Sequence, residues 1–300
     1  MLDLIIIGGS SAATSAGIYA ARRGLNFKIV TKDFSGELAT SGEIGNWPGI
    51  PQTNGIELAE KFREHLEFLN VAIDEDVEIT SIAKEGIGFS INTGAYKTRT
   101  VILATGAHPR ELKIPGEREF RNKGLSYCTT CDGPLFAGKV TATIGGGNSA
   151  LESALMLADI SKKVYVVNKN AQFKGDQVLI DNLNQKKNVE IIYNALTTEI
   201  IGGEFVTGYK YKDARGKENS IETDGIFVHI GMRANSYMAP EGIEKNQSGE
   251  IIVNMNCETN IPGFFAAGDV TNVPFKQNPI AAGQGTVALL SAVSYLNRLK

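Results

Sequence analysis

The sequence has few cysteines, little net charge and no long apolar run. Three cysteines in 300 residues are too few for a disulfide-stapled secreted scaffold, so we expect a reducing, cytoplasmic compartment. A net charge of −3 gives no reason to expect a nucleic acid partner. No apolar run approaches the roughly 18 residues that cross a membrane, and the N-terminus lacks the basic segment of a secretory signal. We therefore expect a soluble protein with no membrane contact.

Glycine, in contrast, is abundant, with 33 residues, and it is concentrated in two similar places. In each, a glycine-rich loop joins a short apolar strand to a helix that carries small residues on one face, and a second strand follows. The two strand–loop–helix–strand units cover residues 4–30 and 140–167. This duplication predicts an α/β fold with two Rossmann-like, three-layer dinucleotide-binding domains.

The segments that follow each unit also resemble one another. Residues 77–97 alternate in polarity and predict a β-meander that leads into a buried strand at 101–104. Residues 191–230 repeat this pattern. Proline and glycine near 108–116 and 239–249 indicate where the chain crosses between the two domains.

Each glycine loop suits a pyrophosphate, because the helix N-terminus behind it offers free N–H groups and a partial positive charge. The second loop fits the dinucleotide pattern well, whereas Ser10 and Ala13 replace two glycines in the first, which leaves a strand–turn–helix without ligand as the alternative. The residues that we expect to contact cofactor in these loops are Gly8, Ser10, Ser11, Ala12, Gly145, Gly147, Asn148 and Ser149.

The end of the second strand of such a unit selects between NADH and NADPH. An acid there binds the ribose 2′-OH, and basic residues favour a 2′-phosphate. The chain has Asn168, Lys169 and Lys174 at this place and no acid, which favours NADPH over NADH. The alternative is that the two lysines are solvated surface residues.

A Cys-x-x-Cys pair, Cys128 and Cys131, lies shortly before the second glycine loop and is followed by Asp132. Such a pair can cycle between dithiol and disulfide, and a helix N-terminus favours the reactive thiolate. Asp132 is placed to move a proton as one thiol leaves. The pattern predicts a redox-active centre with Cys128, Cys131 and Asp132 as its catalytic residues.

A zinc half-site and an inert buried pair are the alternatives for these cysteines. Zinc needs four ligands, but Cys257 has no partner at a suitable spacing and the three histidines, His65, His108 and His229, have no ligand-like spacing. We expect no metal. Cys257 is interpreted as a buried single thiol and the histidines as structural.

The sequence resembles the low-molecular-weight thioredoxin reductases over essentially its whole length. The resemblance rests on five segments: residues 46–49 (NWPG), 104–107 (ATGA), 128–133 (CTTCDG), the loop at 145, and 265–270 (FAAGDV). Residues 276–277 (KQ) and 282–285 (AGQG) add to it. A dithiol directly before the second glycine loop is specific to this family among related flavoproteins.

From Asp132 onward the chain is more similar still to the flavoprotein component of bacterial alkyl hydroperoxide reductase. The similarity rests on residues 132–136 (DGPLF), 176–179 (DQVL), 249–252 (GEII), 257–259 (CET) and 273–277 (VPFKQ). That protein has an additional N-terminal thioredoxin-like module. Because Leu4 already belongs to the first strand here, we expect such a module to act in trans.

The resemblance implies a discontinuous FAD-binding domain, residues 1–111 and 245–300, with an NAD(P)H-binding domain that carries the dithiol, residues 112–244, inserted between its halves. It implies that Asp269 holds the ribityl or pyrophosphate part of FAD. It also implies further flavin contacts from Leu38, Asn46, Ala104, Thr105, Gly106, Gly268, Lys276 and Gln277.

The resemblance further implies an enzyme that passes electrons from NAD(P)H through FAD to the dithiol, and then to the disulfide of a thioredoxin- or glutaredoxin-like protein. Cys131 is the implied flavin-proximal thiol and Cys128 the one that attacks the partner. A homodimer is implied as well. The alternatives are an adaptor-linked peroxiredoxin reductase, a flavin thiol oxidase and a non-catalytic flavin fold.

The family patterns leave the nicotinamide preference open. Thioredoxin reductases that prefer NADPH have His-Arg-Arg at the place of residues 168–170 and an arginine at the place of Lys174, whereas the hydroperoxide reductase flavoproteins, which prefer NADH, have an acid at the place of Asn168. This chain has neither pattern.

Overall fold

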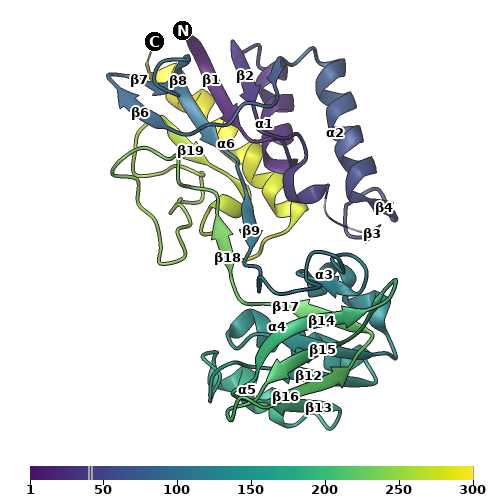
Figure 1. The fold of residues 1–300 in the computed structure, drawn as a ribbon. Coiled ribbons are helices and arrows are strands. Elements are labelled where there is room, and N and C mark those ends of the chain that lie inside the picture. The colour runs from purple at the N-terminus through teal and green to yellow at the C-terminus, as the bar shows by residue number, and fades with distance from the viewer. Residues whose placement is uncertain (40, 42, 300) are drawn as a thin grey trace. The chain divides into compact units, whose positions relative to one another are not determined.

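The computed structural model describes residues 1–39, 41 and 43–299 and divides into two compact units. Unit 1 comprises residues 1–108 and 233–300, and unit 2 comprises residues 109–232. Each unit contains its own parallel sheet (Figure 1). The α/β class with two Rossmann-like sheets is thereby confirmed.

Unit 1 contains a seven-stranded sheet in the order β5-β2-β1-β8-β7-β6, with β19 paired to the end of β8. Strands β2, β8, β5 and β19 run parallel to their partners, and β6 and β7 form the antiparallel meander. The sheet strands are β1 (Leu2–Ile7), β2 (Phe27–Val30), β5 (Ile73–Asp74), β6 (Ile82–Glu85), β7 (Gly88–Ile91), β8 (Tyr96–Leu103) and β19 (Phe264–Ala266).

Three helices and some short elements complete unit 1. Helix α1 follows the first glycine loop, and α6 packs against it (Figure 1). The bounds are α1 (Ser11–Arg22), α2 (Gly55–Phe68), α6 (Asn278–Arg298), the short strands β3 (Glu43–Ile44) and β4 (Thr53–Asn54), and the 3-10 turns η1 (Gly36–Leu38) and η3 (Gly268–Val270).

Helix α6 is long and apolar enough, by length and composition, to cross a membrane. In this fold one face of α6 lies in the core, because Ala288, Leu289 and Ala292 are buried in the same cluster as Leu4 and Ile6 of β1.

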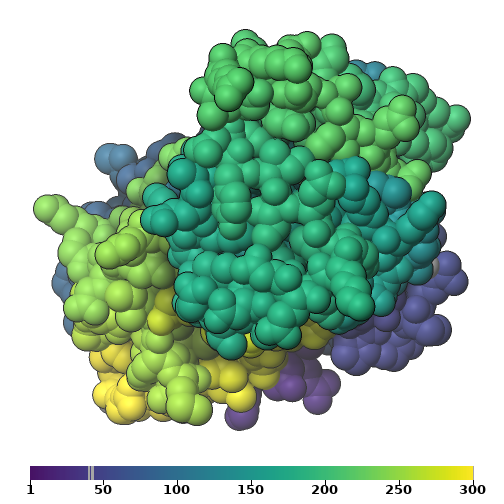
Figure 2. All heavy atoms as spheres, turned by 90° about the horizontal axis from the view of Figure 1, so that it is seen from below, coloured from purple at the N-terminus to yellow at the C-terminus, as the bar shows by residue number. Residues whose placement is uncertain are grey.

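Unit 2 contains a five-stranded parallel sheet in the order β10-β17-β11-β12-β13 and an antiparallel sheet β14-β15-β16. Its surface is shown in space-filling form by the teal and green atoms of Figure 2. The elements are β10 (Leu125–Ser126), α3 (Thr129–Asp132), η2 (Gly133–Phe136), β11 (Val140–Ile144), α4 (Asn148–Ile160), β12 (Lys163–Val167), α5 (Gln177–Asn184), β13 (Val189–Ile192), β14 (Leu196–Gly202), β15 (Val206–Lys212), β16 (Glu218–Glu222) and β17 (Gly225–Val228).

The chain passes between the units through a two-stranded ladder of β9 (Ala107–Pro109) and β18 (Met232–Ala234). The first crossing lies where proline and glycine indicated it, but the second lies before residue 239. Residues 233–244, which the sequence analysis assigned to the inserted domain, belong to unit 1. The reason is packing: Met238 is buried beside Ile5 and Val101 in the core of unit 1.

The second predicted meander also needs a correction. Residues 189–192 form β13, a parallel strand on β12, and the antiparallel meander begins only at Leu196. Val189 and Ile191 pack into the core on one face of the parallel sheet and Ile192 into the core on the other face, so this strand belongs to the parallel sheet.

Candidate functional site

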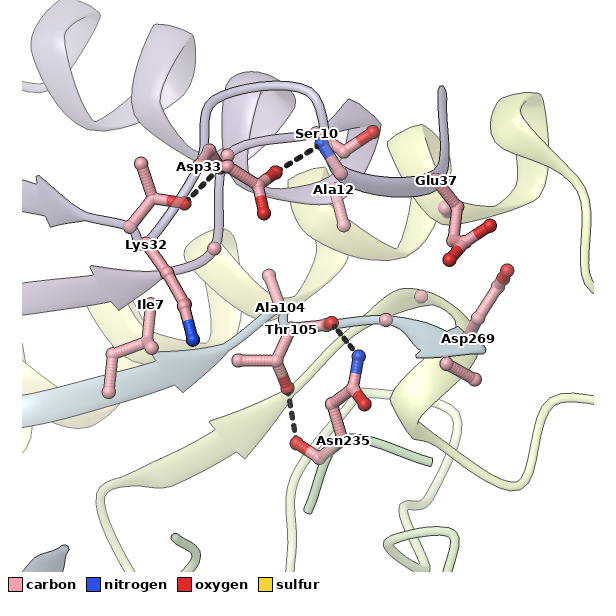
Figure 3. A pocket seen from close by; sticks show the side chains of 18 of the residues that line it. Ile7, Ser10, Ala12, Lys32, Asp33, Glu37, Ala104, Thr105, Asn235 and Asp269 are labelled. Carbon is pink, nitrogen blue, oxygen red and sulfur yellow. Dashed lines mark hydrogen bonds between the residues drawn. The ribbon is translucent and has the colours of Figure 1, made fainter. Parts of the chain in front are cut away.

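A cleft in unit 1 opens at the carboxyl ends of β1, β2 and β8, where α1 begins (Figure 3). The turn beneath it depends on Gly8, which has φ of +130° and whose Cβ would stand 2.2 Å from the carbonyl oxygen of Ala104. Helix α1 starts with no side-chain cap at Ser10 and no acid in its first turn. Its first N–H groups are therefore available to an anionic group.

Ten residues that the sequence predicted for flavin contact line this cleft together. They come from the first glycine loop, the end of β8, η1 and η3: Gly8, Ser10, Ser11, Ala12, Leu38, Ala104, Thr105, Gly106, Gly268 and Asp269. The conformation at Thr105 is fixed by Asn235, since the Thr105 hydroxyl donates to the Asn235 carbonyl at 2.7 Å and the Asn235 amide donates to the Thr105 carbonyl at 2.8 Å (Figure 3).

Asp269 presents its carboxylate to the same cleft (Figure 3). Burial raises the pKa of Asp269 to about 6, and the positive charge of nearby Lys276 acts in the opposite direction. The carboxylate makes no hydrogen bond with any described residue. A half-buried acceptor without a partner suits a ligand that brings hydroxyl donors.

Three residues predicted for flavin contact lie off the cleft lining. The Asn46 amide donates to the Gln277 side-chain oxygen at 3.1 Å, so these two side chains lie together. Lys276 donates to the Thr271 carbonyl at 2.6 Å and pairs with Glu250 at 2.9 Å. Lys276 therefore lies off the cleft lining, and its charge lowers the pKa of Asp269.

The cleft also contains polar residues that sequence reasoning missed. Asp33 follows β2, about twenty residues after the glycine turn, which is where an acid commonly binds a ribose; that spacing was a usable signal. Its carboxylate accepts from the Gly36 N–H at 2.8 Å. Glu37 is paired with His108 and also lines the cleft. Asn235 also lines the cleft, and no spacing in the sequence indicates this because only the tertiary fold brings Asn235 there.

In unit 2 the second glycine loop joins β11 to α4. Gly145 has φ of +153°, and a Cβ there would stand 2.2 Å from the carbonyl oxygen of His229. Gly147 caps α4 without a side-chain hydrogen bond and has open space where its Cβ would be. Ser149 lies in the first turn of this helix. The Asn148 side chain is hydrogen-bonded to Asp176: its amide donates to the Asp176 carboxylate at 2.9 Å, and its oxygen accepts from the Asp176 backbone N–H at 2.8 Å.

The residues expected to select the nicotinamide cofactor are only partly free to do so. Asn168 is buried against Gly146, its amide donates to the Gln172 carbonyl at 2.9 Å, and its oxygen accepts from the Asn170 N–H at 3.0 Å. This side chain therefore holds its own loop in shape. Lys169 and Lys174 are exposed and make no ion pair within the described part of the chain.

The two predicted redox cysteines form a disulfide, Cys128–Cys131, at the start of α3. Cys128 caps this helix, and its sulfur accepts from the Cys131 N–H at 3.2 Å. The N–H also stabilises negative charge on that sulfur once the disulfide opens. Among the described residues, no group of three or more potential metal ligands lies together.

Asp132 is coupled to the disulfide through Ser126, which the sequence analysis missed. The Ser126 hydroxyl donates to the Asp132 carboxylate at 2.5 Å, and the Cys128 N–H donates to the same hydroxyl at 3.0 Å. Burial raises the pKa of Asp132, and the Ser126 hydrogen bond lowers it. A carboxyl with a raised pKa beside a disulfide is suited to general acid–base work.

The remaining candidates are Cys257, which does not line either site, and the histidines, of which His108 lines the cleft of unit 1 and His229 lies beside the dithiol turn. Cys257 is buried, and burial raises the pKa of its thiol to about 11. His229 is not an isolated structural residue, since it contacts Thr129 of the dithiol turn at 2.8 Å.

The family follows from a comparison with known proteins. The model of the family described as pyridine nucleotide-disulphide oxidoreductase matches residues 2–285. The chain belongs to this family. The family description names oxidoreductases that couple a pyridine nucleotide to a disulfide, and Cys128–Cys131 is the disulfide that this chain offers for such chemistry. The family implies FAD and NAD(P)H as cofactors.

Individual relatives agree with this assignment. The chain is 42% identical over 306 residues to a subunit of the Escherichia coli alkyl hydroperoxide reductase, covering 99% of this chain and 59% of that protein. It therefore spans somewhat more than half the length of the curated relatives that it matches. The structure of thioredoxin reductase from Streptococcus pyogenes superposes with a TM-score of 0.93 at 33% identity, over 99% of both chains.

A third relative differs in its named electron donor. A ferredoxin-flavin thioredoxin reductase from Clostridium acetobutylicum is 31% identical, with a TM-score of 0.55, over 99% of this chain and 98% of that one. The predicted resemblance to thioredoxin reductases and to the hydroperoxide reductase flavoprotein is confirmed.

The cleft of unit 1 fits FAD. The uncapped N-terminus of α1 suits its pyrophosphate, and the partnerless Asp269 carboxylate suits hydroxyls of its ribityl chain. When bound, the flavin supplies a carrier that accepts two electrons from a nicotinamide and passes them to a disulfide.

We expect Asp269→Asn to weaken FAD binding by about 10- to 100-fold, because hydrogen bonds to a charged acceptor are lost. The same change should stabilise the FAD-free protein at pH 8 by about 2 kcal/mol, since the folded pKa of about 6 lies above the ordinary value for aspartate and ionisation opposes folding above it. The gain should vanish near pH 4, where the wild-type carboxyl is protonated in the folded state. Urea unfolding at both pH values and flavin fluorescence titration measure the two effects, and a variant less stable at pH 8 would contradict this assignment.

Proposed function

We propose that the protein transfers two electrons from NAD(P)H, through FAD and the Cys128/Cys131 dithiol, to the disulfide of a thioredoxin- or glutaredoxin-like protein. The observation that carries this proposal is the disulfide at the start of α3, with the Asp132 carboxyl joined to the Cys128 backbone through the Ser126 hydroxyl. We assign unit 1 to FAD, unit 2 to the nicotinamide nucleotide, and the physiological setting to the cytoplasm as a homodimer.

The dithiol residues have distinct proposed roles. The Cys128 sulfur, stabilised as thiolate by the Cys131 N–H, attacks the partner disulfide, and the sulfur–sulfur bond of the partner breaks to release its thiolate. Cys131 then attacks the mixed disulfide, which reforms the Cys128–Cys131 bond and frees the second partner thiol. Asp132 holds the proton that moves to or from the departing sulfur, with Ser126 fixing its position.

A change at Asp132 should alter both the rate and its pH dependence. We expect Asp132→Asn to slow disulfide reduction by about 10²- to 10⁴-fold, the usual contribution of a general acid or base. Ser126→Ala should retain more activity and move the Asp132-dependent limb of the pH–rate profile to higher pH, because the hydrogen bond that lowers the pKa is removed. A limb that stays in place in Ser126→Ala would argue against Asp132 as the titrating group.

A second candidate is reductase for a peroxiredoxin through an adaptor, which is favoured by the 42% identity to the Escherichia coli alkyl hydroperoxide reductase protein. The dithiol chemistry is the same, and only the partner differs. In that case the adaptor is a thioredoxin-like module.

Partner reduction distinguishes these candidates. The FAD-loaded enzyme is mixed with NADH or NADPH and one of three acceptors: oxidised thioredoxin, oxidised glutaredoxin, or a peroxiredoxin with and without an isolated thioredoxin-like module. Rapid nucleotide oxidation with a small disulfide protein supports the proposal. Oxidation only with peroxiredoxin plus module supports the second candidate, whereas oxygen uptake with dithiols and no nucleotide identifies a thiol oxidase.

A further inference from the structure

His229 lies at one end of a buried hydrogen-bond chain in unit 2. Its Nε2 is 2.8 Å from Oγ1 of Thr129, which is 2.6 Å from Oγ of Ser153, which in turn is 3.2 Å from Oγ1 of Thr143. Thr129 belongs to the Cys-x-x-Cys turn, Ser153 to α4 and Thr143 to β11. This series of hydrogen bonds thus joins the dithiol turn to β11 and α4, the two elements that flank the second glycine loop.

The direction of these hydrogen bonds follows from the far end of the chain. Thr143 is fully buried and its hydroxyl has Ser153 as its sole partner among the described residues, so donation to Ser153 is the direction that leaves its hydrogen with an acceptor. Ser153 then donates to Thr129, and Thr129 donates to the histidine. The reverse direction would leave the Thr143 hydroxyl hydrogen buried without an acceptor.

This direction fixes the tautomer of His229. Burial lowers its pKa to about 4, so the ring is neutral at physiological pH and carries one hydrogen. With Nε2 accepting from Thr129, that hydrogen is on Nδ1. Nδ1 has no hydrogen-bond partner within the described part of the chain, and it is not one of the fully buried unpaired atoms, so it is a donor still open to solvent.

The place of this donor in the sheet points to its ligand. Strands β12 and β17 lie on opposite sides of β11, so the ligand crevice of the sheet opens between the ends of β11 and β17. The adenosine half of a dinucleotide extends over β12, where Asn168 lies, and the other half extends over β17. His229 directly follows β17, and Gly145 of the loop rests on its carbonyl group.

We propose that His229 donates a hydrogen bond from Nδ1 to the nicotinamide half of the bound nucleotide, and that Thr129 is the positioning residue that fixes the tautomer required for it. The inference rests on the proposed function, which assigns the nucleotide to unit 2. One residue then contacts both the dithiol turn and the half of the nucleotide that reacts.

Two amide substitutions separate the two ring nitrogens. In His229→Gln the amide extends about as far as Nε2 and can still bond Thr129, whereas in His229→Asn it extends about as far as Nδ1. Calorimetric titration of the FAD-loaded enzyme with NADH, NADPH and ADP gives the binding constants. ADP serves as the control ligand because it lacks nicotinamide and its ribose.

We expect His229→Gln to bind the preferred dinucleotide about 3- to 10-fold more weakly, as for one lost neutral hydrogen bond, and to bind ADP as the wild type does. His229→Asn should lose less affinity for the dinucleotide than His229→Gln. Equal dinucleotide binding by wild type and His229→Gln, or equal weakening for ADP, would overturn the inference. If the wild type binds neither dinucleotide, both this inference and the proposed function are wrong.

The tautomer itself gives an independent test. Nitrogen-15 NMR of the wild-type histidine should show hydrogen on Nδ1, and in Thr129→Val, which removes the donor to Nε2, the ring should shift toward the Nε2–H form. Thr129→Val should also weaken dinucleotide but not ADP binding. A wild-type ring with its hydrogen on Nε2 would overturn the inference whether or not the nucleotide assignment is correct.

Discussion

Replacing either redox cysteine by serine should reduce NAD(P)H-dependent reduction of a protein disulfide by at least about a thousand-fold, because the nucleophile or the resolving thiol is lost. The two variants should differ in what they accumulate. Cys131→Ser keeps the Cys128 sulfur and should trap a mixed disulfide with the partner, whereas Cys128→Ser should trap none. Mass spectrometry of the mixture after non-reducing gel separation measures this difference.

The trapping pattern tests the assignment of roles and not only the need for a dithiol. The Cys131 N–H stabilises charge on the Cys128 sulfur, which makes Cys128 the expected attacking group. The control is Cys257→Ser, which removes a buried thiol outside the dithiol and should trap nothing. A mixed disulfide in Cys128→Ser but not in Cys131→Ser would reverse the roles.

The second large effect is expected at Gly145. Gly145→Ala should abolish reduction of the flavin by nucleotide, with a loss of more than about 100-fold, because its φ of +153° strains an L-residue and its Cβ would collide with the His229 carbonyl at 2.2 Å. Flavin content should be retained, since the cleft that fits FAD lies in unit 1. Stopped-flow absorbance of the flavin measures the rate.

Two further glycines provide matched controls. Gly147→Ala has open space for its Cβ and should leave unfolding unchanged, but it should weaken nucleotide binding because a methyl group is introduced where the pyrophosphate approaches. Gly203→Ala, also in open space, lies in the turn between β14 and β15 and should behave as the wild type. Normal flavin reduction in Gly145→Ala would contradict a nucleotide site at this loop.

The periodic parts of the fold were predictable from the sequence because local pattern and tertiary role agree there. The run at 4–7 is buried on both faces, as a parallel strand requires, and the strand at 27–30 was placed correctly. The second crossing was misplaced, since nothing local distinguishes residues 233–244 from the preceding strand. What decides their place is the burial of Met238 in unit 1.

The candidate sites divide in the same way. Loop residues such as Gly8 and Gly145 and the pair Cys128–Cys131 are recognisable because their chemistry depends on residue type and spacing. Asn235 and Ser126 act through contacts with Thr105 and Asp132, and Thr129 acts through its contact with His229. No spacing rule covers such pairs. They are found only once the fold brings them together.

The central claim is that one chain holds a flavin in electronic contact with a redox-active dithiol and is reduced by a nicotinamide nucleotide. Anaerobic titration of the FAD-loaded protein with NADH and NADPH in parallel, followed by flavin absorbance, tests it directly. We expect bleaching at stoichiometric amounts of one nucleotide, with uptake of more than two electrons because flavin and disulfide are both reduced. Protein that dithionite bleaches but neither nucleotide reduces would contradict the account and favour a different electron donor.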